Sequence, residues 1–104
     1  MKFWFTCKNP NWVNNGERNV MFLMHMQNYL NDKLRARGYV TVAEVLEQIG
    51  INPIDSKYKG FAFNHIYNYS IEGTYVDFGL KFKNVRRAKT KFQLNINVED
   101  SVYI

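Results

Sequence analysis

The sequence is poor in the residues that build disulfides and metal sites: it has one cysteine, two histidines and two prolines among 104 residues. Cys7 alone cannot form an internal disulfide, and no set of cysteine and histidine has the spacing of a zinc site. No apolar run approaches the ~20 residues of a membrane helix, and the apolar start of the chain is too short for a signal peptide. We therefore expect a reduced, partly buried thiol at Cys7, a cytoplasmic setting and no membrane partner.

Motifs of known enzyme classes are missing as well. The sequence contains no Gly-rich phosphate loop, nucleophile elbow, kinase motif or zincin motif. Neither His25 nor His65 has a partner at metal-ligand spacing. One alternative stays open, because Asp77 with Glu99 or Asp100 on neighbouring strands is a conceivable Mg²⁺ site of a small nuclease. Our main expectation is a protein that is not an enzyme, with no catalytic residue, cofactor or metal.

The residues that are abundant are apolar and aromatic. Hydrophobic residues make up 46% of the chain and aromatic residues 16%. A chain of this length and composition can bury one core without disulfides or metals. We therefore predict a single domain over residues 1–104.

Two helices are predicted in the N-terminal half. Over Glu17–Arg37, apolar residues recur at spacings of three and four and form one face of a long helix. That face consists of Leu23, Met26, Leu30 and Leu34. Gly38 follows as a residue that can end a helix with positive φ. Thr41 and Glu44 match a capping box, which starts a short helix that ends at Gly50. The expected buried face of this second helix consists of Val42, Val45, Leu46 and Ile49.

From Phe61 onward the apolar period changes to two. Alternating runs over 61–69, 75–82 and 91–98 predict strands with one buried and one wet face. A short edge strand is predicted over Met1–Thr6. The fold class is therefore α+β, with one long and one short N-terminal helix packed on a three- to four-stranded antiparallel meander. A helix over 56–67 stays open, because apolar residues there also recur at spacings of three and four.

A run of positive charge is the most distinctive electrostatic feature, and no acidic residue interrupts it. Its members, all candidate partner-binding residues, are Lys81, Lys83, Arg86, Arg87, Lys89 and Lys91. In the strand interpretation they form the tip and flanks of a hairpin. This hairpin either contacts phosphates or an acidic protein surface, or it is a solvated ribbon whose charges discourage edge-to-edge pairing. Phe82 and Phe92 are expected to point inward, which would leave the exposed charges without aromatic rings among them.

Three tyrosines are further candidates for partner binding: Tyr67, Tyr69 and Tyr75. In one interpretation, these rings cover the helices as part of the core. In the other, the tyrosine end of the sheet extends beyond the core as an interaction patch, since tyrosine is enriched at interfaces.

The stretch from Leu34 to Ile51 resembles the opening of a winged helix-turn-helix domain, in which a capped helix ends in glycine. In that alternative, a helix over 56–67 would read DNA and the basic hairpin would be the wing. Gly60 would interrupt such a recognition helix. A DNA-binding regulator is therefore the alternative function.

Two stretches together resemble a family of small, uncharacterised phage and prophage proteins of Gram-positive bacteria. The first runs from His25 to Leu34 and continues with Gly38-Tyr39-Val40 and Glu44-Val45 through Gly50. The second is Tyr75–Leu80, followed by Leu94–Asp100. Departures occur over 55–69, where relatives carry a Gly-Trp pair, and at Glu99-Asp100 in place of Asp-Gly. The resemblance implies a phage origin and transfers no activity and no catalytic residue.

The resemblance and the charge together lead to an expected function. Phage genomes encode many small, non-enzymatic proteins that act in the cytoplasm of the bacterial host cell. By that analogy we expect a binding protein whose partner is a host or phage protein or a ribonucleoprotein complex, and an anti-CRISPR-like inhibitor of host defence fits this description. The net charge of +5 disfavours mimicry of nucleic acid and leaves open a direct contact between the basic hairpin and nucleic acid.

Overall fold

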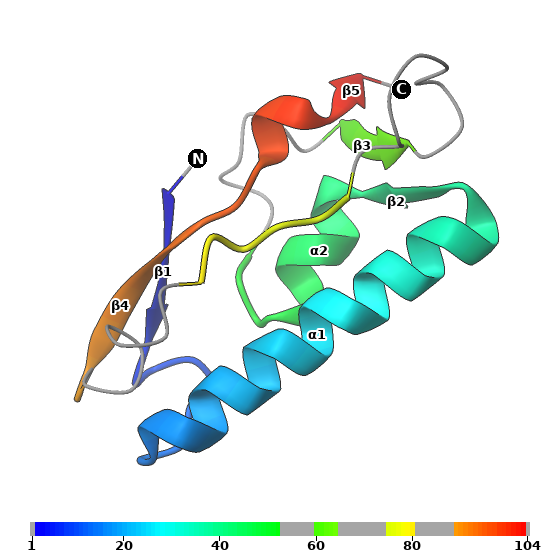
Figure 1. Cartoon of the computed structure of the whole chain (residues 1–104). Helices are drawn as coiled ribbons and strands as arrows, with labels where there is room; N and C mark the ends of the chain where they lie inside the picture. Colours follow the sequence, from blue (N-terminus) through cyan, green and yellow to red (C-terminus); the bar gives the residue numbers. More distant parts are fainter. Residues whose placement is uncertain (1, 53–59, 65–74, 81–88, 104) are drawn as a thin grey trace.

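The computed structural model describes residues 2–52, 60–64, 75–80 and 89–103, and this part of the chain is α+β as predicted (Figure 1). Among its helices, none is both long and apolar enough to cross a membrane. The elements are, in order, β1 (Lys2–Thr6), α1 (Gly16–Arg37), β2 (Tyr39–Thr41), α2 (Val42–Gln48), β3 (Phe61–Asn64), β4 (Lys91–Asn95), the 3₁₀ helix η2 (Val98–Asp100) and β5 (Val102–Tyr103).

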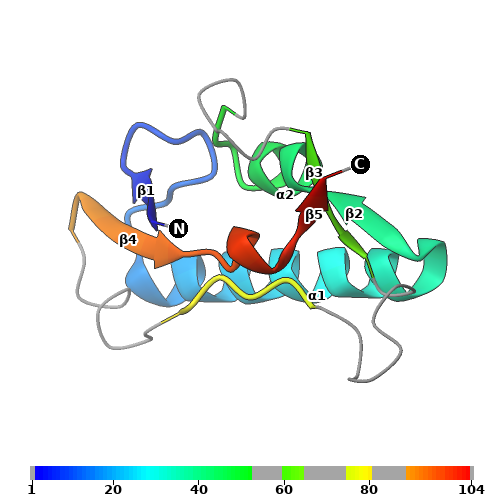
Figure 2. The same ribbon diagram turned by 90° about the horizontal axis from the view of Figure 1, so that it is seen from above.

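The strands form two small antiparallel sheets, which lie over opposite ends of α1 (Figures 1 and 2). β1 pairs with β4 over the N-terminal part of the helix, with Phe5 opposite Phe92. β3 lies between β2 and β5 over the C-terminal part, with Val40 opposite Phe63. The buried side chains of both sheets and both helices belong to one cluster, so a single core joins the two ends.

The long helix α1 confirms the predicted helix to within one residue at its start. Asn15 caps it, because its Oδ1 accepts a hydrogen bond from Arg18 N at 3.2 Å. Gly38 ends it with a φ of 89° and donates its N–H to Leu34 O. Leu23, Leu30 and Leu34 are buried as predicted, and Met26 is half-buried.

The short helix α2 confirms its predicted buried face, which consists of Val42, Val45, Leu46 and Ile49. The Thr41 hydroxyl accepts a hydrogen bond from Glu44 N at 3.0 Å, which is the first half of the predicted capping box. The second half is wrong, because the Glu44 carboxylate contacts Arg37 and Lys33 at the end of α1. The sequence pattern was ambiguous because a carboxylate near a cap can bond either to backbone or to a nearby cation.

Aromatic rings close the end of the core beneath β1 and β4. The Phe5 ring centroid lies 5.6 Å from Trp12, 5.3 Å from Phe92 and 6.1 Å from Phe22. These rings come from two strands, a loop and α1, so they join four separate segments. Such ring pairs add to the area that they bury.

The predicted meander is not shown. The strand over 61–69 is present as β3 over Phe61–Asn64, which excludes the alternative helix at those positions, and residues 65–69 lie outside the described part. The run over 91–98 is β4 up to Asn95. The run over 75–82 is described up to Leu80 and is not a strand there. In the described residues, β3 pairs with β2 and β5, whereas β4 pairs with β1.

Side-chain amides explain why segment 75–80 is extended without being a strand. Asn31 on α1 accepts a hydrogen bond from Val76 N at 2.7 Å and donates one to Val76 O at 3.0 Å. Gln27 accepts from Phe78 N at 2.9 Å, and Asn97 accepts from Asp77 N at 2.8 Å. Val76 and Phe78 are buried as the alternation predicts. The N–H groups of Val76, Asp77 and Phe78 are thus bonded by side-chain amides, whereas Asp77 O and Phe78 O accept backbone hydrogen bonds from Asn97 N at 3.1 Å and Asn95 N at 3.0 Å.

Candidate functional site

The predicted partner-binding residues fall in two groups. Those outside the described part of the chain are Lys81, Lys83, Arg86, Arg87, Tyr67 and Tyr69. Lys89 and Lys91 are exposed at the start of β4, and Tyr75 is exposed beside α1. The structure therefore places Tyr75 apart from the two lysines, at the other end of segment 75–80.

The outward face of β1 and β4 forms a surface that we call the cationic ribbon. It consists of Lys2, Trp4, Thr6, Lys91, Gln93 and Asn95. Alternation along both strands turns Phe3, Phe5, Phe92 and Leu94 the other way, toward the core. Phe92 thus points inward as predicted, with 6% of its surface exposed. Polar, charged and one aromatic side chain remain on the outside.

Trp4 stands in the middle of this ribbon and is 51% exposed. The bond from Cys7 N to Thr90 O, at 2.7 Å, sets the phase of the ladder, so Trp4 and Gln93 form a non-hydrogen-bonded pair. Side chains of such pairs approach each other most closely. The ammonium of Lys91 lies 4.8 Å from the Trp4 ring centroid, in a cation–π contact.

This arrangement corrects one expectation. The exposed charges were predicted to have no aromatic ring among them, and Trp4 lies directly beside Lys91. The alternation of residues 2–6 does separate Trp4 from Phe3 and Phe5. The missing information was the partner of β1, because a pairing between positions so distant in sequence leaves no local signal.

The surface around the ribbon continues its positive character. Lys8 and Lys89 are both exposed, and neither the stretch 2–15 nor the stretch 89–98 contains an acidic residue. Among the described residues, the salt bridges involve Lys33, Arg35 and Arg37 on α1, and none involves a lysine of the ribbon. The ribbon therefore presents charge that the described part of the chain does not neutralise.

A shallow groove of about 270 Å³ lies along β1. Trp4, Thr6 and Lys8 line one side, and Gly50 and Ile51 after α2 line the other. Asn9 fixes the loop between them by donating a hydrogen bond from its side chain to Ile49 O at 2.8 Å. The exposed indole is thus bordered by a concave surface as well as by cations.

The cations at the end of α1 differ from those of the ribbon because they are paired internally. Glu44 contacts Lys33 Nζ at 2.9 Å and an Arg37 guanidinium nitrogen at 2.6 Å. Partial burial alone would raise the pKa of the Glu44 carboxyl, but these hydrogen bonds outweigh it and hold the pKa below its usual range. This cluster ties α1 to α2 and offers little free charge to a partner.

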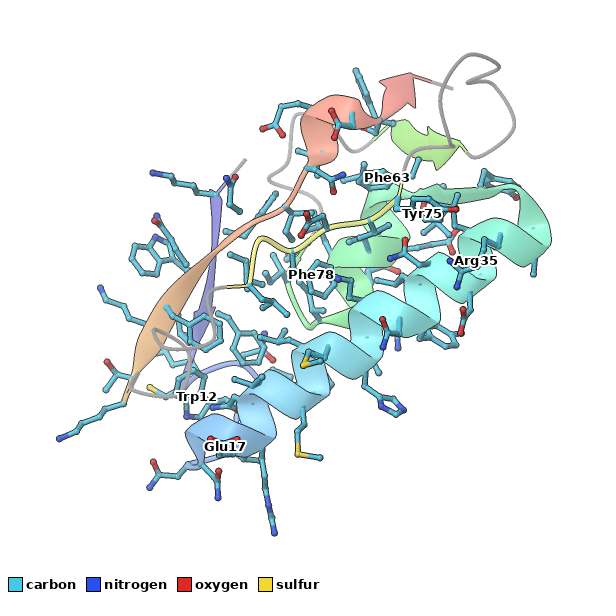
Figure 3. All side chains as sticks on the ribbon, in the orientation of Figure 1. Trp12, Glu17, Arg35, Phe63, Tyr75 and Phe78 are labelled. Carbon is cyan, nitrogen blue, oxygen red and sulfur yellow. The ribbon has the colours of Figure 1, made fainter. Side chains whose placement is uncertain are left out.

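Tyr75 lies beside this second group of cations. The guanidinium of Arg35 is 5.7 Å from the Tyr75 ring centroid and also pairs with Asp32 (Figure 3). The hydrogen bond that the Arg35 guanidinium donates to Asp32 raises the pKa of Arg35. Tyr75 adds to this effect, and desolvation opposes it. Tyr75 therefore contacts α1 through Arg35, and its position does not extend the cationic ribbon.

In the described residues, no group of three or more histidine, cysteine or acidic side chains could hold a metal ion, so no third ligand of these types joins Asp77 and the Glu99–Asp100 pair there. Asp77 Oδ1 accepts a hydrogen bond from Gly79 N at 2.8 Å, and Asp100 Oδ2 accepts one from Asn97 at 3.2 Å. The two carboxylates thus serve local turns. The expectation for Cys7 was also wrong in part, because its side chain is exposed.

Comparison with known families matches residues 2–104 to the DUF6353 family, whose function is unknown. The chain belongs to this family. No curated protein and no solved structure matches it. For this DUF6353 member, the case for a function therefore depends on its own residues, and the cationic ribbon is the part of the described surface with the clearest chemical character.

Proposed function

We propose that this DUF6353 member is a non-catalytic binding protein that engages an anionic macromolecular partner through the basic segment 81–91 and the cationic ribbon. The observation that supports the proposal most directly is the exposed indole of Trp4 beside Lys91, on a surface without acidic residues. Exposed tryptophan is typical of binding surfaces, and unneutralised lysines attract an anionic partner. Because β4 begins at Lys91, the basic segment enters this ribbon directly.

The biological setting that we propose follows from the resemblance to phage and prophage proteins. In that setting the protein acts in the cytoplasm of a bacterial host, and its partner is a host or phage protein or a ribonucleoprotein complex. Inhibition of a host defence system, in the manner of an anti-CRISPR protein, is the role that fits a small binding protein best. A basic inhibitor would bind an acidic protein surface or an exposed guide strand.

The test is charge reversal at the centre of the basic segment. Affinity purification from infected cells, followed by mass spectrometry, identifies the partner of the wild-type chain. We expect Arg86→Glu with Arg87→Glu to reduce recovery of that partner strongly at low salt, because two attractions become repulsions. Far-UV circular dichroism checks that the variant remains folded.

Arg18→Glu is the control, since Arg18 is an exposed cation on α1 that belongs neither to the basic segment nor to the ribbon strands. It should leave recovery unchanged. If the double reversal also leaves recovery unchanged at low salt, the contact surface lies elsewhere and the proposal is wrong.

A further inference from the structure

We infer that the cationic ribbon binds single-stranded nucleic acid, with Trp4 as a stacking surface for a base and the neighbouring lysines as phosphate contacts. This inference rests on the proposed function and narrows its anionic partner to one chemical class. It is carried by the described residues of β1 and β4 and needs no contact from segment 81–88.

The position of the indole favours a single-stranded ligand. Trp4 is 51% exposed on the outward face of a two-stranded ribbon, where the core gains nothing from its size. Proteins that bind single strands present aromatic rings in this way, because every base has a face that stacks on them. The groove along β1 gives the stacked nucleotide room beside Trp4 and Thr6.

Positive charge surrounds the ring. Lys91 already lies 4.8 Å from the indole centroid, and Lys2, Lys8 and Lys89 are exposed nearby in the chain. Each lysine is a flexible point charge that can follow a phosphate along a backbone. A base on Trp4 would therefore bring its own phosphate within reach of Lys91.

Trp4 lies opposite Gln93 across the ribbon. A glutamine amide both donates and accepts hydrogen bonds, so it can meet the edge of a base that stacks on the adjacent ring. A duplex hides its base faces in its own stack and cannot use the indole in this way. An acidic protein surface can also bury an indole. A single strand, however, offers a flat base and a phosphate at adjacent positions, which matches the Trp4–Lys91 pair and favours this ligand.

The experiment measures binding of the full chain to fluorescein-labelled oligothymidylate and oligouridylate of about 12 nucleotides by fluorescence anisotropy at low salt. A duplex of the same length and polyglutamate serve as competing probes. Trp4→Ala is expected to weaken binding of the single strand about 5- to 150-fold, the range for the loss of one stacking contact. Trp4→Tyr retains a ring and should restore most of the affinity.

Tyr29→Ala is the matched control, because Tyr29 is an aromatic residue of similar exposure, 47%, on α1. It should bind like the wild type. A second readout uses Trp12→Phe, which leaves Trp4 as the one tryptophan in the chain. An unlabelled single strand should then quench the remaining emission. Lys89→Ala with Lys91→Ala should reduce the slope of log affinity against log salt by about 1.4, for two phosphate contacts.

Three results would overturn the inference: no binding of either oligonucleotide, equal binding of the duplex with no effect of Trp4→Ala, or binding of polyglutamate alone. The last result would leave the proposed function standing with an acidic protein as partner. Conversely, a single strand could bind in a Trp4-dependent way while partner recovery stays unchanged after charge reversal at Arg86 and Arg87. This pair of results would support binding by the ribbon and refute the role of the basic segment.

Discussion

Replacing Asn31 with alanine is expected to lower the free energy of unfolding by about 1–5 kcal/mol. Asn31 is the residue of α1 that holds both backbone groups of Val76, with distances of 2.7 and 3.0 Å. Val76 is 1% exposed, so water has little access to those groups once the amide is gone. The variant therefore tests whether side-chain amides do the work of a strand partner for segment 75–80.

The magnitude follows from two backbone groups losing their partner. Each buried donor or acceptor left unsatisfied costs about 1–3 kcal/mol. Alanine is a better helix former than asparagine, and this returns roughly 0.6 kcal/mol within α1. Because small domains are stable by only about 5–15 kcal/mol, the net loss is a large fraction of the total.

The assay is urea unfolding followed by far-UV circular dichroism. A lower midpoint with an unchanged slope would indicate a loss of stability without a change in the surface exposed on unfolding. Asn31→Asp separates the two hydrogen bonds, because a carboxylate still accepts from Val76 N and cannot donate to Val76 O. We expect it to be destabilising too, since the charged oxygen faces a carbonyl oxygen.

Asn28→Ala is the matched control, because Asn28 is exposed one turn earlier on the same helix. Its replacement should stabilise the protein slightly through helix propensity alone. If Asn31→Ala and Asn28→Ala shift the urea midpoint equally, the paired hydrogen bonds at Val76 contribute nothing and the reasoning is refuted.

Two further predictions concern the cation cluster and a glycine. The lowered pKa of Glu44 means that the unfolded chain binds its proton more tightly than the folded protein does, so this group stabilises the fold above the ordinary glutamate value of 4.5. That contribution is about 1 kcal/mol, comes from Lys33 and Arg37, and should fade as the pH falls below this value. Urea unfolding at a series of pH values should therefore show a smaller loss of unfolding free energy in acid for Glu44→Gln than for the wild type. An equal loss would contradict the prediction. Gly79→Ala should lower the free energy of unfolding by at least about 2 kcal/mol in the same assay, because Gly79 has a φ of 62° and a Cβ there would lie 2.7 Å from Asn95 O. An unchanged free energy of unfolding would show that the segment can shift to accommodate the methyl group.

The helices could be predicted from the sequence because their signals are local. The spacing of the apolar residues, the glycine after α1 and the threonine before α2 each act within a few residues of the element that they define. The ends of both helices are correct to within two residues for this reason. The same holds for the burial of Val76 and Phe78, since alternation reports burial whatever the hydrogen-bonding partner is.

The sheet arrangement could not be predicted because its pairings are distant in sequence. Periodicity of two marks an extended chain with one buried face, and it does not identify the neighbour. A meander is the simplest arrangement of successive strands. The protein instead pairs β4 with β1. Segment 75–80 combines side-chain bonds from Gln27, Asn31 and Asn97 with backbone bonds from Asn95 and Asn97, and alternation alone does not predict this arrangement.

The pairing of β1 with β4 also bears on why lysines and a tryptophan lie on the cationic ribbon. β1 pairs only with β4 among the described strands, so it carries an outer edge that could recruit strands from other molecules. Lys2 and Lys91 protect such an edge by repulsion, and this alone would account for the lysines. It does not account for Trp4, because an exposed indole increases the attraction that those charges oppose. A surface that combines both is therefore better explained by a ligand that uses the ring and the charges together than by protection of the edge.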